Sequence, residues 1–293
     1  MKEENNNQQN EQNGVSRRNF LTKAGLAAGA LSLGSLNLMA SSRSDNEPIK
    51  SNGKVALVTG SSRGIGAAIA KQLAADGFSV VVNCLKSRDL AANVVNSITK
   101  AGGKAVWLQA DVRNAGQVKS LFDLAQKEYG GVDVVINNAG IMNLAPFANM
   151  TDEDFDQMMD TNIKGGFNVL REAARRVKNG GRIISTSSSI TIMKTATYGP
   201  YAASKAALQH YSSCLAKELS GKQISVNAIA PGVVNTPLFT DGKTPELIKN
   251  FEQRTPHGRL GEPEDIAQVV SSLCSDHCAW VNGQTIYANG GLV

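Results

Sequence analysis

The sequence predicts an α/β fold: one doubly wound parallel sheet with helices on both faces. Three observations support this prediction. Short runs rich in Val, Ile and Leu alternate with segments of helical period from residue 54 onward. A glycine-rich turn directly follows the first of these runs. The chain has 293 residues, 42% of them hydrophobic, which suffices for one large domain, and no second block of composition marks another.

Each element is predicted from its own pattern. Short apolar runs predict strands at residues 54–58, 78–82, 105–108, 132–136, 182–185, 224–229 and 284–288. Stripes of apolar residues, such as Ile65, Ile69 and Leu73, predict helices at residues 64–75, 90–99, 118–129, 155–177, 201–219 and 264–274. Such an alternation pairs the strands in parallel, so the ligand crevice is expected at their carboxyl ends.

The amino-terminal 40 residues are predicted to be an export signal. Residues 1–14 are rich in Asn, Gln and Glu; Arg17 and Arg18 follow, and then a modestly apolar run at 24–40. This order resembles a bacterial twin-arginine signal, which implies export of a folded protein to the periplasm. The alternative is a chance arginine pair in a cytoplasmic protein. Whether the signal is cleaved or stays as an anchor is open. Residues 41–52 are interpreted as a linker and 53–293 as the catalytic domain.

Charge and composition limit the classes of ligand that the protein is expected to bind. The formal net charge of +5 favours an anionic partner, but the basic residues are scattered and aromatic residues make up only 5%. Nucleic acid is therefore not expected, and a phosphate-rich cofactor is. Cys84, Cys214, Cys274 and Cys278 match no zinc pattern, so no metal site is predicted. Burial of Cys274 and Cys278 as small apolar residues is favoured, and a disulfide between them stays open.

The turn at residues 59–66 is predicted to bind a pyrophosphate. Glycines let the chain turn sharply and approach the phosphates, and the N-terminus of the following helix offers free N–H groups. The spacing differs from the general G-x-G-x-x-G dinucleotide fingerprint. The predicted contacts in this turn are Gly60, Ser62, Arg63, Gly64, Ile65 and Gly66.

The end of the second strand predicts NADP(H) rather than NAD. An acid there would bind the ribose hydroxyls and repel a 2′-phosphate. This strand instead ends at Asn83 and Cys84, followed by Lys86 and Ser87. Arg63, Lys86 and Ser87 can bind the phosphate, and Asn83 is included in the predicted cofactor site.

Tyr201 and Lys205 form the predicted chemical centre. Their i, i+4 spacing places them on one face of a helix, where the ammonium is expected to favour the phenolate. The phenol can then give a proton to a carbonyl oxygen or take one from an alcohol. Tyr198 lacks this spacing. A hydroxyl from residues 185–189 can hold the substrate oxygen, and composition does not choose among them.

Several motifs follow one another in order along the chain. They are Thr59-Gly60-x-x-x-Gly64-x-Gly66, Asp111-Val112, Asn137-Asn138-Ala139-Gly140, Asn162, Ser188, Tyr201-x-x-x-Lys205 and Pro231-Gly232-x-x-x-Thr236. From about residue 54 to 293, this series resembles the short-chain dehydrogenase/reductase family, which implies a Rossmann fold. The chain is in general most similar to 3-oxoacyl-carrier-protein reductases and broad carbonyl reductases.

The resemblance implies a role for each matching position. Ser188 orients the substrate, Tyr201 is the acid/base, and Lys205 lowers the pKa of the tyrosine and binds the nicotinamide ribose. Asn162 holds a water in the proton relay. The implied nucleotide contacts are Asp111 and Val112 at the adenine, Asn138, Ala139 and Gly140 at the adenosine ribose, and Pro231, Gly232, Val234 and Thr236 at the nicotinamide.

These observations predict an enzyme that transfers a hydride between NADP(H) and a carbonyl or secondary alcohol, reducing a ketone or 3-oxoacyl-type compound. Net alcohol oxidation by the same residues is one alternative, and a non-catalytic NADP(H)-binding sensor is another. The resemblance also implies a homotetramer formed by residues 155–177, 201–219 and 284–288. Residues 238–256 form the expected specificity loop, which carries no readable substrate code.

Overall fold

The computed structural model describes residues 49–293, so the predicted twin-arginine segment and most of the linker lie outside the described residues. Within this range the chain builds a single sheet of seven parallel strands in the order β3-β2-β1-β4-β5-β6-β7. The predicted fold class is confirmed. The strands are β1 (Val55–Val58), β2 (Ser79–Cys84), β3 (Lys104–Gln109), β4 (Val132–Asn137), β5 (Val177–Thr186), β6 (Ser225–Pro231) and β7 (Thr285–Ala288).

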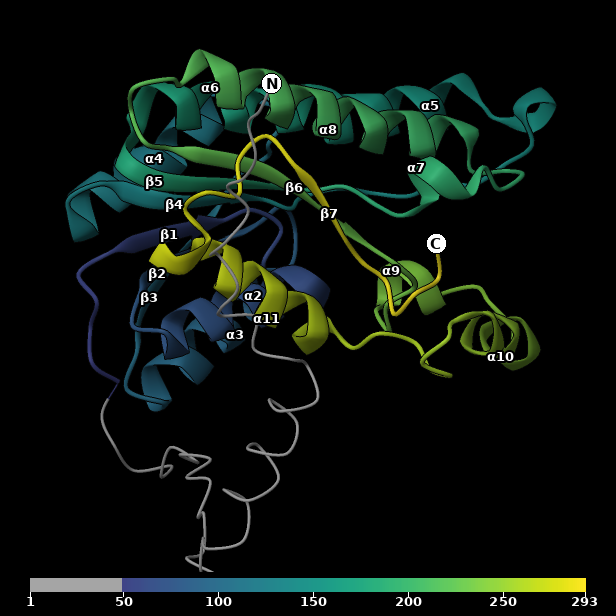
Figure 1. Ribbon diagram of the computed structural model, residues 1–293, viewed down its shortest axis with the longest axis horizontal. Helices are drawn as coiled ribbons and strands as arrows, with labels where there is room; N and C mark the ends of the chain where they lie inside the picture. Colours follow the sequence, from purple (N-terminus) through teal and green to yellow (C-terminus); the bar gives the residue numbers. More distant parts are fainter. Residues whose placement is uncertain (1–48) are drawn as a thin grey trace, which may run out of the picture. The chain divides into compact units, whose positions relative to one another are not determined.

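Helices cover both faces of the sheet (Figure 1). One face carries α2 (Gly64–Ala75), α3 (Arg88–Lys100) and α11 (Pro263–Cys274). The other carries α4 (Ala115–Tyr129), α6 (Gly166–Arg176) and α8 (Gly199–Glu218). The remaining helices are α5 (Asp152–Met159), α7 (Ile190–Met193), α9 (Pro237–Thr240) and α10 (Pro245–Arg254), the π-helix η2 (Asp160–Gly165), and the short 3₁₀ helices η1 (Phe147–Asn149) and η3 (Asp276–Cys278). None of the helices within residues 49–293 has the length and apolar character of a membrane span.

The core consists of two layers, one on each side of the sheet. All of β1 is buried: Ala56 and Val58 face the layer under α2, whereas Val55 and Leu57 face the layer under α4. Successive strand residues point to opposite faces, so a central strand covered on both sides must be apolar throughout. Burying each such aliphatic side chain contributes roughly 1.5–3 kcal/mol. The core therefore holds the carboxyl ends of β1, β4 and β5 in fixed positions.

The prediction of one long helix at residues 155–177 is wrong in detail. The observed helical segment begins at Asp152, and the π-helix η2 interrupts it between α5 and α6. Two glycines pack too closely for a side chain: a Cβ on Gly165 would lie 2.7 Å from Val112 Cγ2, and one on Gly166 would lie 2.6 Å from Leu208 Cδ2. The wider turn carries Asn162, and π-turns inside α-helices are frequent at functional sites.

Two loop expectations also change. Residues 238–256, expected to be a loop, contain most of α9 and all of α10; Thr244 caps α10 by accepting a hydrogen bond from the N–H of Leu247 at 3.3 Å. The end of the expected linker is attached to the fold, because Asn52 donates its backbone N–H to Gly77 O at 3.0 Å and its side-chain amide to Asp76 O at 3.0 Å.

Candidate active site

The glycine turn lies against β4. Gly60 has a φ of +61°, and a Cβ there would lie 2.8 Å from Ala139 Cα. A Cβ on Gly66 would lie 2.4 Å from Gly60 O and 2.5 Å from the side-chain nitrogen of Asn138. Glycine is therefore required at both positions, by conformation at the first and by close approach at the second.

Two asparagines hold this turn. Asn83, only 1% exposed, accepts from the backbone N–H of Gly60 at 3.0 Å and donates to Ala110 O at 3.0 Å. Asn138 donates to Thr59 O at 3.0 Å and to Gly60 O at 3.1 Å. Because the Asn83 amide has partners within the protein, the structure gives it a positioning role; its direct contact with a nucleotide stays a prediction.

The first turn of α2 is suited to an anion. Its N-cap residue, Arg63, makes no side-chain capping hydrogen bond, and the first turn contains no acidic residue. The first N–H groups of a helix have no partner within the helix, and the helix dipole makes this end partly positive. Ser62, Gly64 and Ile65 are partly exposed here, and Arg63 is exposed. The turn can therefore bind a phosphate.

The end of β2 is basic at the surface. Lys86 is exposed and Ser87 partly exposed, directly after the strand. The nearest acid of the predicted site, Asp111, lies after β3 and pairs with Arg113 at 2.7 Å. Hydrogen bonds from Arg113 hold the pKa of Asp111 below its usual range. β2 itself contains no carboxylate, and the first acid after it is Asp89 in the first turn of α3, so the strand end lacks the acid that would bind the ribose hydroxyls.

Among the serines after β5, only the middle one faces the site. Ser187 is buried and donates to Lys205 O at 2.9 Å, and Ser189 is buried and donates to Ala230 O at 3.1 Å. Ser188 is partly exposed and lies close enough to the phenol of Tyr201 for its hydroxyl to lower the pKa of the tyrosine. The geometry thus favours the serine that the motif spacing selects.

Tyr201 and Lys205 lie in the first turns of α8, which begins at Gly199 with a proline at its start. Both side chains are buried. The Lys205 ammonium donates to Thr186 O at 2.9 Å and lies 5.9 Å from the centre of the Tyr201 ring. The i, i+4 spacing therefore brings cation and phenol together on one helix face, as predicted.

Burial shifts the pKa of both groups. It raises the pKa of Tyr201 above the ordinary value of a phenol, and the neighbouring Ser188 hydroxyl offsets only part of this effect. It also lowers the pKa of Lys205 to about 8. Loss of water disfavours the charged form of each group. The lowering of the tyrosine pKa by Lys205, which the resemblance implies, stays a prediction.

Asn162 connects the catalytic helix to β4. Its side chain donates to Ile141 O and to Ser204 Oγ, both at 2.9 Å, and accepts from the Ile141 N–H at 2.9 Å. A Cβ on Gly140 would lie 3.1 Å from both Asn162 Oδ1 and Lys205 Nζ. Gly140, Asn162 and Lys205 are therefore brought together. The water predicted at Asn162 stays a prediction.

The predicted nicotinamide contacts follow β6. Gly232 packs against Asn289, where a Cβ would lie 2.8 Å from the asparagine Cβ. Val234 pairs with Gly261 in an isolated parallel bridge. Thr236 reaches the glycine turn, with its Cγ2 3.4 Å from a Cβ built on Gly64. The segment after Pro231 thus closes the site opposite α2. Of the other predicted contacts, Val112 is buried and Ala139 partly exposed.

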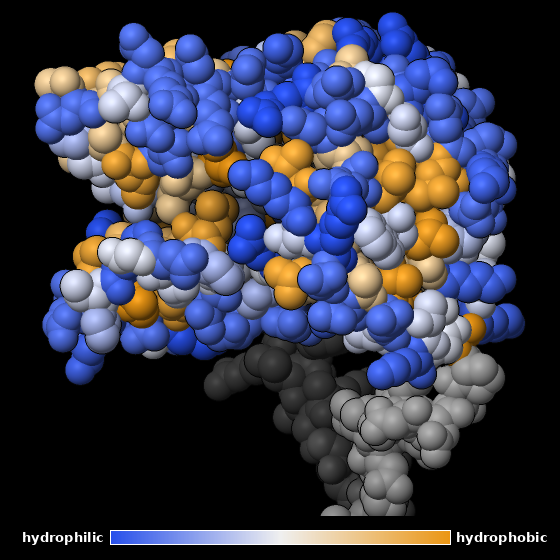
Figure 2. All heavy atoms as spheres, turned by 180° about the vertical axis from the view of Figure 1, so that it is seen from behind, coloured by the Kyte–Doolittle hydropathy of each residue, from blue (hydrophilic) through white to orange (hydrophobic). Residues whose placement is uncertain are grey.

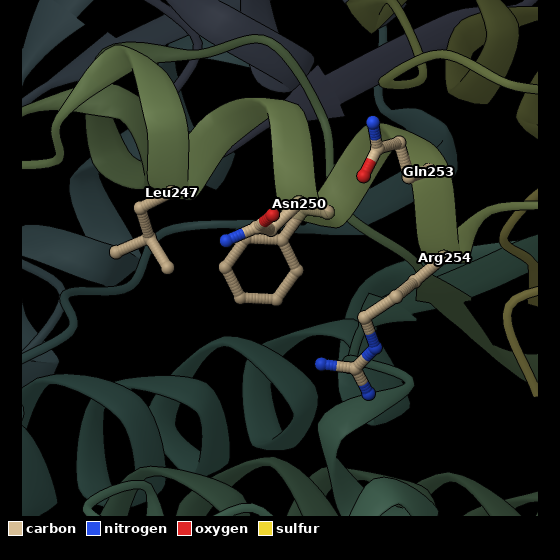
Figure 3. A pocket seen from close by; sticks show the side chains of 5 residues that line it. Leu247, Asn250, Gln253 and Arg254 are labelled. Carbon is tan, nitrogen blue, oxygen red and sulfur yellow. The ribbon is translucent and has the colours of Figure 1, made fainter.

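The carboxyl edge of the sheet opens into a cleft. A cavity of about 420 Å³ lies against α10, lined by Leu247, Asn250, Phe251, Gln253 and Arg254. Leu247, Asn250 and Arg254 project from one side of this helix toward the helices that face it (Figure 3). A second cavity, of about 190 Å³, adjoins Gly232 and Val234. Tyr201 lines neither cavity. We therefore locate the reaction centre at the Tyr201 phenol and not in either cavity.

Three supporting residues were missed from the sequence. Thr59 accepts from the N–H groups of Asn138 and Ala139 at 3.0 and 3.1 Å. Thr186 donates to Asn138 Oδ1 and accepts from Lys205. Ser204 donates to Tyr201 O and accepts from Asn162. All three are buried hydroxyls beside named motif residues. The only sequence signal for these three residues was their position next to motif residues. That position does not distinguish a supporting hydroxyl from an ordinary polar residue.

These features fit a dinucleotide. The glycine approach to Ala139, the uncapped start of α2 and the basic end of β2 lie along one edge, next to Ser188, Tyr201 and Lys205. A nucleotide-dependent oxidoreductase with a Rossmann fold is the class that this fold and site define.

Comparison with known proteins identifies the family. Residues 60–293 match the family described as "Enoyl-(Acyl carrier protein) reductase". The chain is 43% identical over 260 residues to an NADPH-dependent aldehyde reductase-like protein of Arabidopsis thaliana, covering 84% of this chain and 96% of that protein. It is 41% identical over 263 residues to a versicolorin reductase of Emericella nidulans, covering 85% and 98%. The chain belongs to the short-chain dehydrogenase/reductase family.

Solved structures agree with this assignment. A Burkholderia cenocepacia short-chain dehydrogenase in complex with NADP superposes with a TM-score of 0.78 at 35% identity, covering 84% of this chain and 99% of that one. The angucycline C-6 ketoreductase LanV with bound NADP also gives 0.78, at 35% identity, covering 84% and 97%.

Proposed function

We propose that this enzyme reduces ketones or aldehydes, 3-oxoacyl-type compounds included, with NADPH. The observation that carries the proposal is the buried Tyr201 phenol with Ser188 and Lys205 beside it, at the same sheet edge as the glycine turn. Relatives named as NADPH-dependent aldehyde reductases and a ketoreductase solved with NADP support the direction and the cofactor.

The residues divide the chemistry among them. Ser188 holds the carbonyl oxygen next to the Tyr201 hydroxyl, which donates its proton as that oxygen becomes negative. The raised pKa of Tyr201 keeps this proton on the phenol until then. Lys205, fixed by Thr186 O, supplies positive charge beside the phenolate that remains. When bound, the nucleotide supplies or accepts the hydride.

Cofactor choice follows from charge. Arg63 and Lys86 are exposed cations at the turn and after β2, and β2 itself contains no acid. A 2′-phosphate there gains charge-assisted hydrogen bonds, so NADP(H) is bound in preference to NAD(H).

The test is NADPH consumption by the purified full-length protein with a panel of aldehydes and ketones, repeated with NADH. We expect turnover with NADPH and weaker binding of NADH. Equal or better use of NADH would overturn the cofactor assignment. Tight NADPH binding without turnover of any carbonyl or alcohol would favour the sensor alternative, and turnover only from alcohols with NADP⁺ would favour the oxidative one.

We also propose export through the twin-arginine route, supported by the sequence from Ser16 to Lys23 and the apolar run after it. The protein is then periplasmic and carries its nucleotide across already bound. Replacing Arg17 and Arg18 by lysine should leave the protein in the cytoplasm of an expressing bacterium. Fractionation that finds wild type and variant in the same compartment would contradict this.

A homotetramer is proposed as well. Phe167 on α6 is exposed, stacks edge-on against Tyr211 of α8 at 6.3 Å, and lies under Arg171 at 5.2 Å. Tyr287 on β7 is also exposed. Exposed aromatic groups of this kind are enriched at protein interfaces. Light scattering should give the mass of four chains, and the mass of one chain would contradict the proposal.

A further inference from the structure

The catalytic tyrosine belongs to an apolar cluster that is separate from both sheet layers. Met158, Ile190 and Tyr201 are its buried members. Half-buried apolar residues pack around them: Ile141, Met142, Leu144, Met150, Met159, Met193, Tyr198 and Ala202. We call this group the methionine cluster.

The methionine content of the cluster is its distinguishing property. The chain has seven methionines, and the five within residues 49–293 all belong to this cluster. None contributes to the two layers that hold the sheet. Only Met158 of the five is fully buried. The other four present part of their surface to solvent or ligand, so filling the protein core does not account for them.

The elements that carry the cluster also carry the site. Met142 follows Gly140 in the loop after β4, and Met193 ends α7, which begins two residues after Ser188. Met159 immediately precedes η2, which holds Asn162. The cluster therefore forms the wall beside the phenol, on the side of the cleft formed by α5, α7 and α8.

Exposed apolar side chains continue this wall around the cleft. Ile192 on α7 is 47% exposed, Leu238 on α9 50%, and Leu247 on α10 42%. Phe147, 80% exposed, lies over Gly199 at the start of α8, where a Cβ would come within 2.4 Å of its ring. Figure 2 shows the hollow at this edge with hydrophobic residues along both sides.

We propose that the methionine cluster is the subsite for the body of the substrate, and that it selects bulky apolar, above all aromatic, ketones and aldehydes over small polar ones. This inference rests on the proposed function and adds the substrate class. Methionine is flexible and polarisable and makes favourable contacts with aromatic rings, so such a wall accepts rings of different shape. Every member of the cluster is apolar or aromatic, so a small polar substrate gains little from it.

The first test compares substrates on the full-length enzyme with NADPH. Along straight-chain aldehydes, kcat/KM should rise about fourfold for each added methylene until the wall is covered. Methyl naphthyl ketone should be used far better than butanedione. If kcat/KM does not change along the aldehyde series, or if butanedione is preferred, the proposed subsite is wrong, although the proposed carbonyl reduction still stands.

Variants locate the effect. Met142→Gln and Met193→Gln keep the side-chain length and add a polar amide, so the ratio of kcat/KM for methyl naphthyl ketone over butanedione should fall about tenfold. Met193→Leu should retain the ratio. Leu90→Gln places the same change at an exposed apolar residue of α3 that is not a member of the methionine cluster, and it should also retain the ratio. Thermal melting confirms that each variant folds.

A binding measurement separates this proposal from the proposed function. Calorimetric titration of methyl naphthyl ketone into the enzyme saturated with NADP⁺ measures the affinity of the ketone for the methionine cluster without turnover. Binding that weakens in Met142→Gln and Met193→Gln, but not in Leu90→Gln, supports the subsite even if no carbonyl is reduced. Affinity that is equal in all the variants overturns it.

Discussion

Adjacent residues of one type have different roles after β5. Ser188 faces the phenol, whereas Ser189 donates to Ala230 O and accepts from the Asn289 amide at 3.0 Å. Ser188→Ala should reduce kcat about a hundredfold and leave stability unchanged. Ser189→Ala should instead lower the free energy of unfolding by about 1–3 kcal/mol, because it leaves buried groups without partners.

Turnover and urea denaturation of both variants check this pair of predictions. If Ser189→Ala lost turnover and Ser188→Ala lost only stability, the assignment of the substrate-orienting serine would be reversed.

The buried lysine predicts a pH dependence. Burial lowers the pKa of Lys205 to about 8, so its ammonium is present below that pH and lost above it. For reduction, kcat/KM, which reports ionisations of the free enzyme, should therefore fall as pH rises through about 8. Lys205→Arg keeps its charge to far higher pH and should shift the fall upward, with a lower maximum. A falling limb at the same pH in both proteins would assign it to another group.

Two exposed cations are expected to bind the 2′-phosphate of NADPH. Arg63→Gln with Lys86→Gln removes both exposed cations near the turn and the end of β2. The dissociation constant of NADPH should rise about a hundredfold to ten-thousandfold, since each of the two charge-assisted hydrogen bonds contributes roughly 1.5–3 kcal/mol in favourable geometry. NADH lacks the 2′-phosphate and serves as the control ligand. A similar loss of NADH affinity would show a general defect of the turn.

At the scale of elements, the glycine turn depends on contact between β1, α2 and β4. Gly66→Ala would place its Cβ against Gly60 O and the Asn138 amide, both closer than atoms tolerate. We expect lost NADPH binding and a lower melting temperature. Gly116→Ala, also in the first turn of a helix, meets only Asn114 Oδ1 at 3.2 Å and should retain binding. Fluorescence titration and melting curves compare the two.

Regular elements could be predicted because hydrophobic period depends on local sequence. The helix at 64–75 has the bounds that the pattern indicated. The π-turn at Asn162 could not be predicted from local sequence. It goes together with the close packing of Gly165 on Val112, which lies more than 50 residues away in the chain. Helix α10 was missed because it is short and has only three apolar residues, Leu247, Ile248 and Phe251, none of which is buried.

At the scale of the whole molecule, the fold and the site follow from one topology. Parallel strands bring every carboxyl end to one edge, so Gly60 after β1, Asn138 after β4 and Ser188 after β5 meet there although they are far apart in sequence. Motif order therefore predicted which residues assemble. It could not predict the electrostatic balance at Tyr201, because burial depends on all the elements that surround the phenol.

Proton donation by Tyr201 is tested by measuring NADPH-dependent carbonyl reduction by Tyr201→Phe together with the affinity of this variant for NADPH. The substitution removes only the hydroxyl that donates the proton. We predict that turnover falls by about a hundredfold to ten-thousandfold while the dissociation constant of NADPH stays unchanged. Full turnover in the variant would contradict the account, because the proton would then come from a group other than Tyr201.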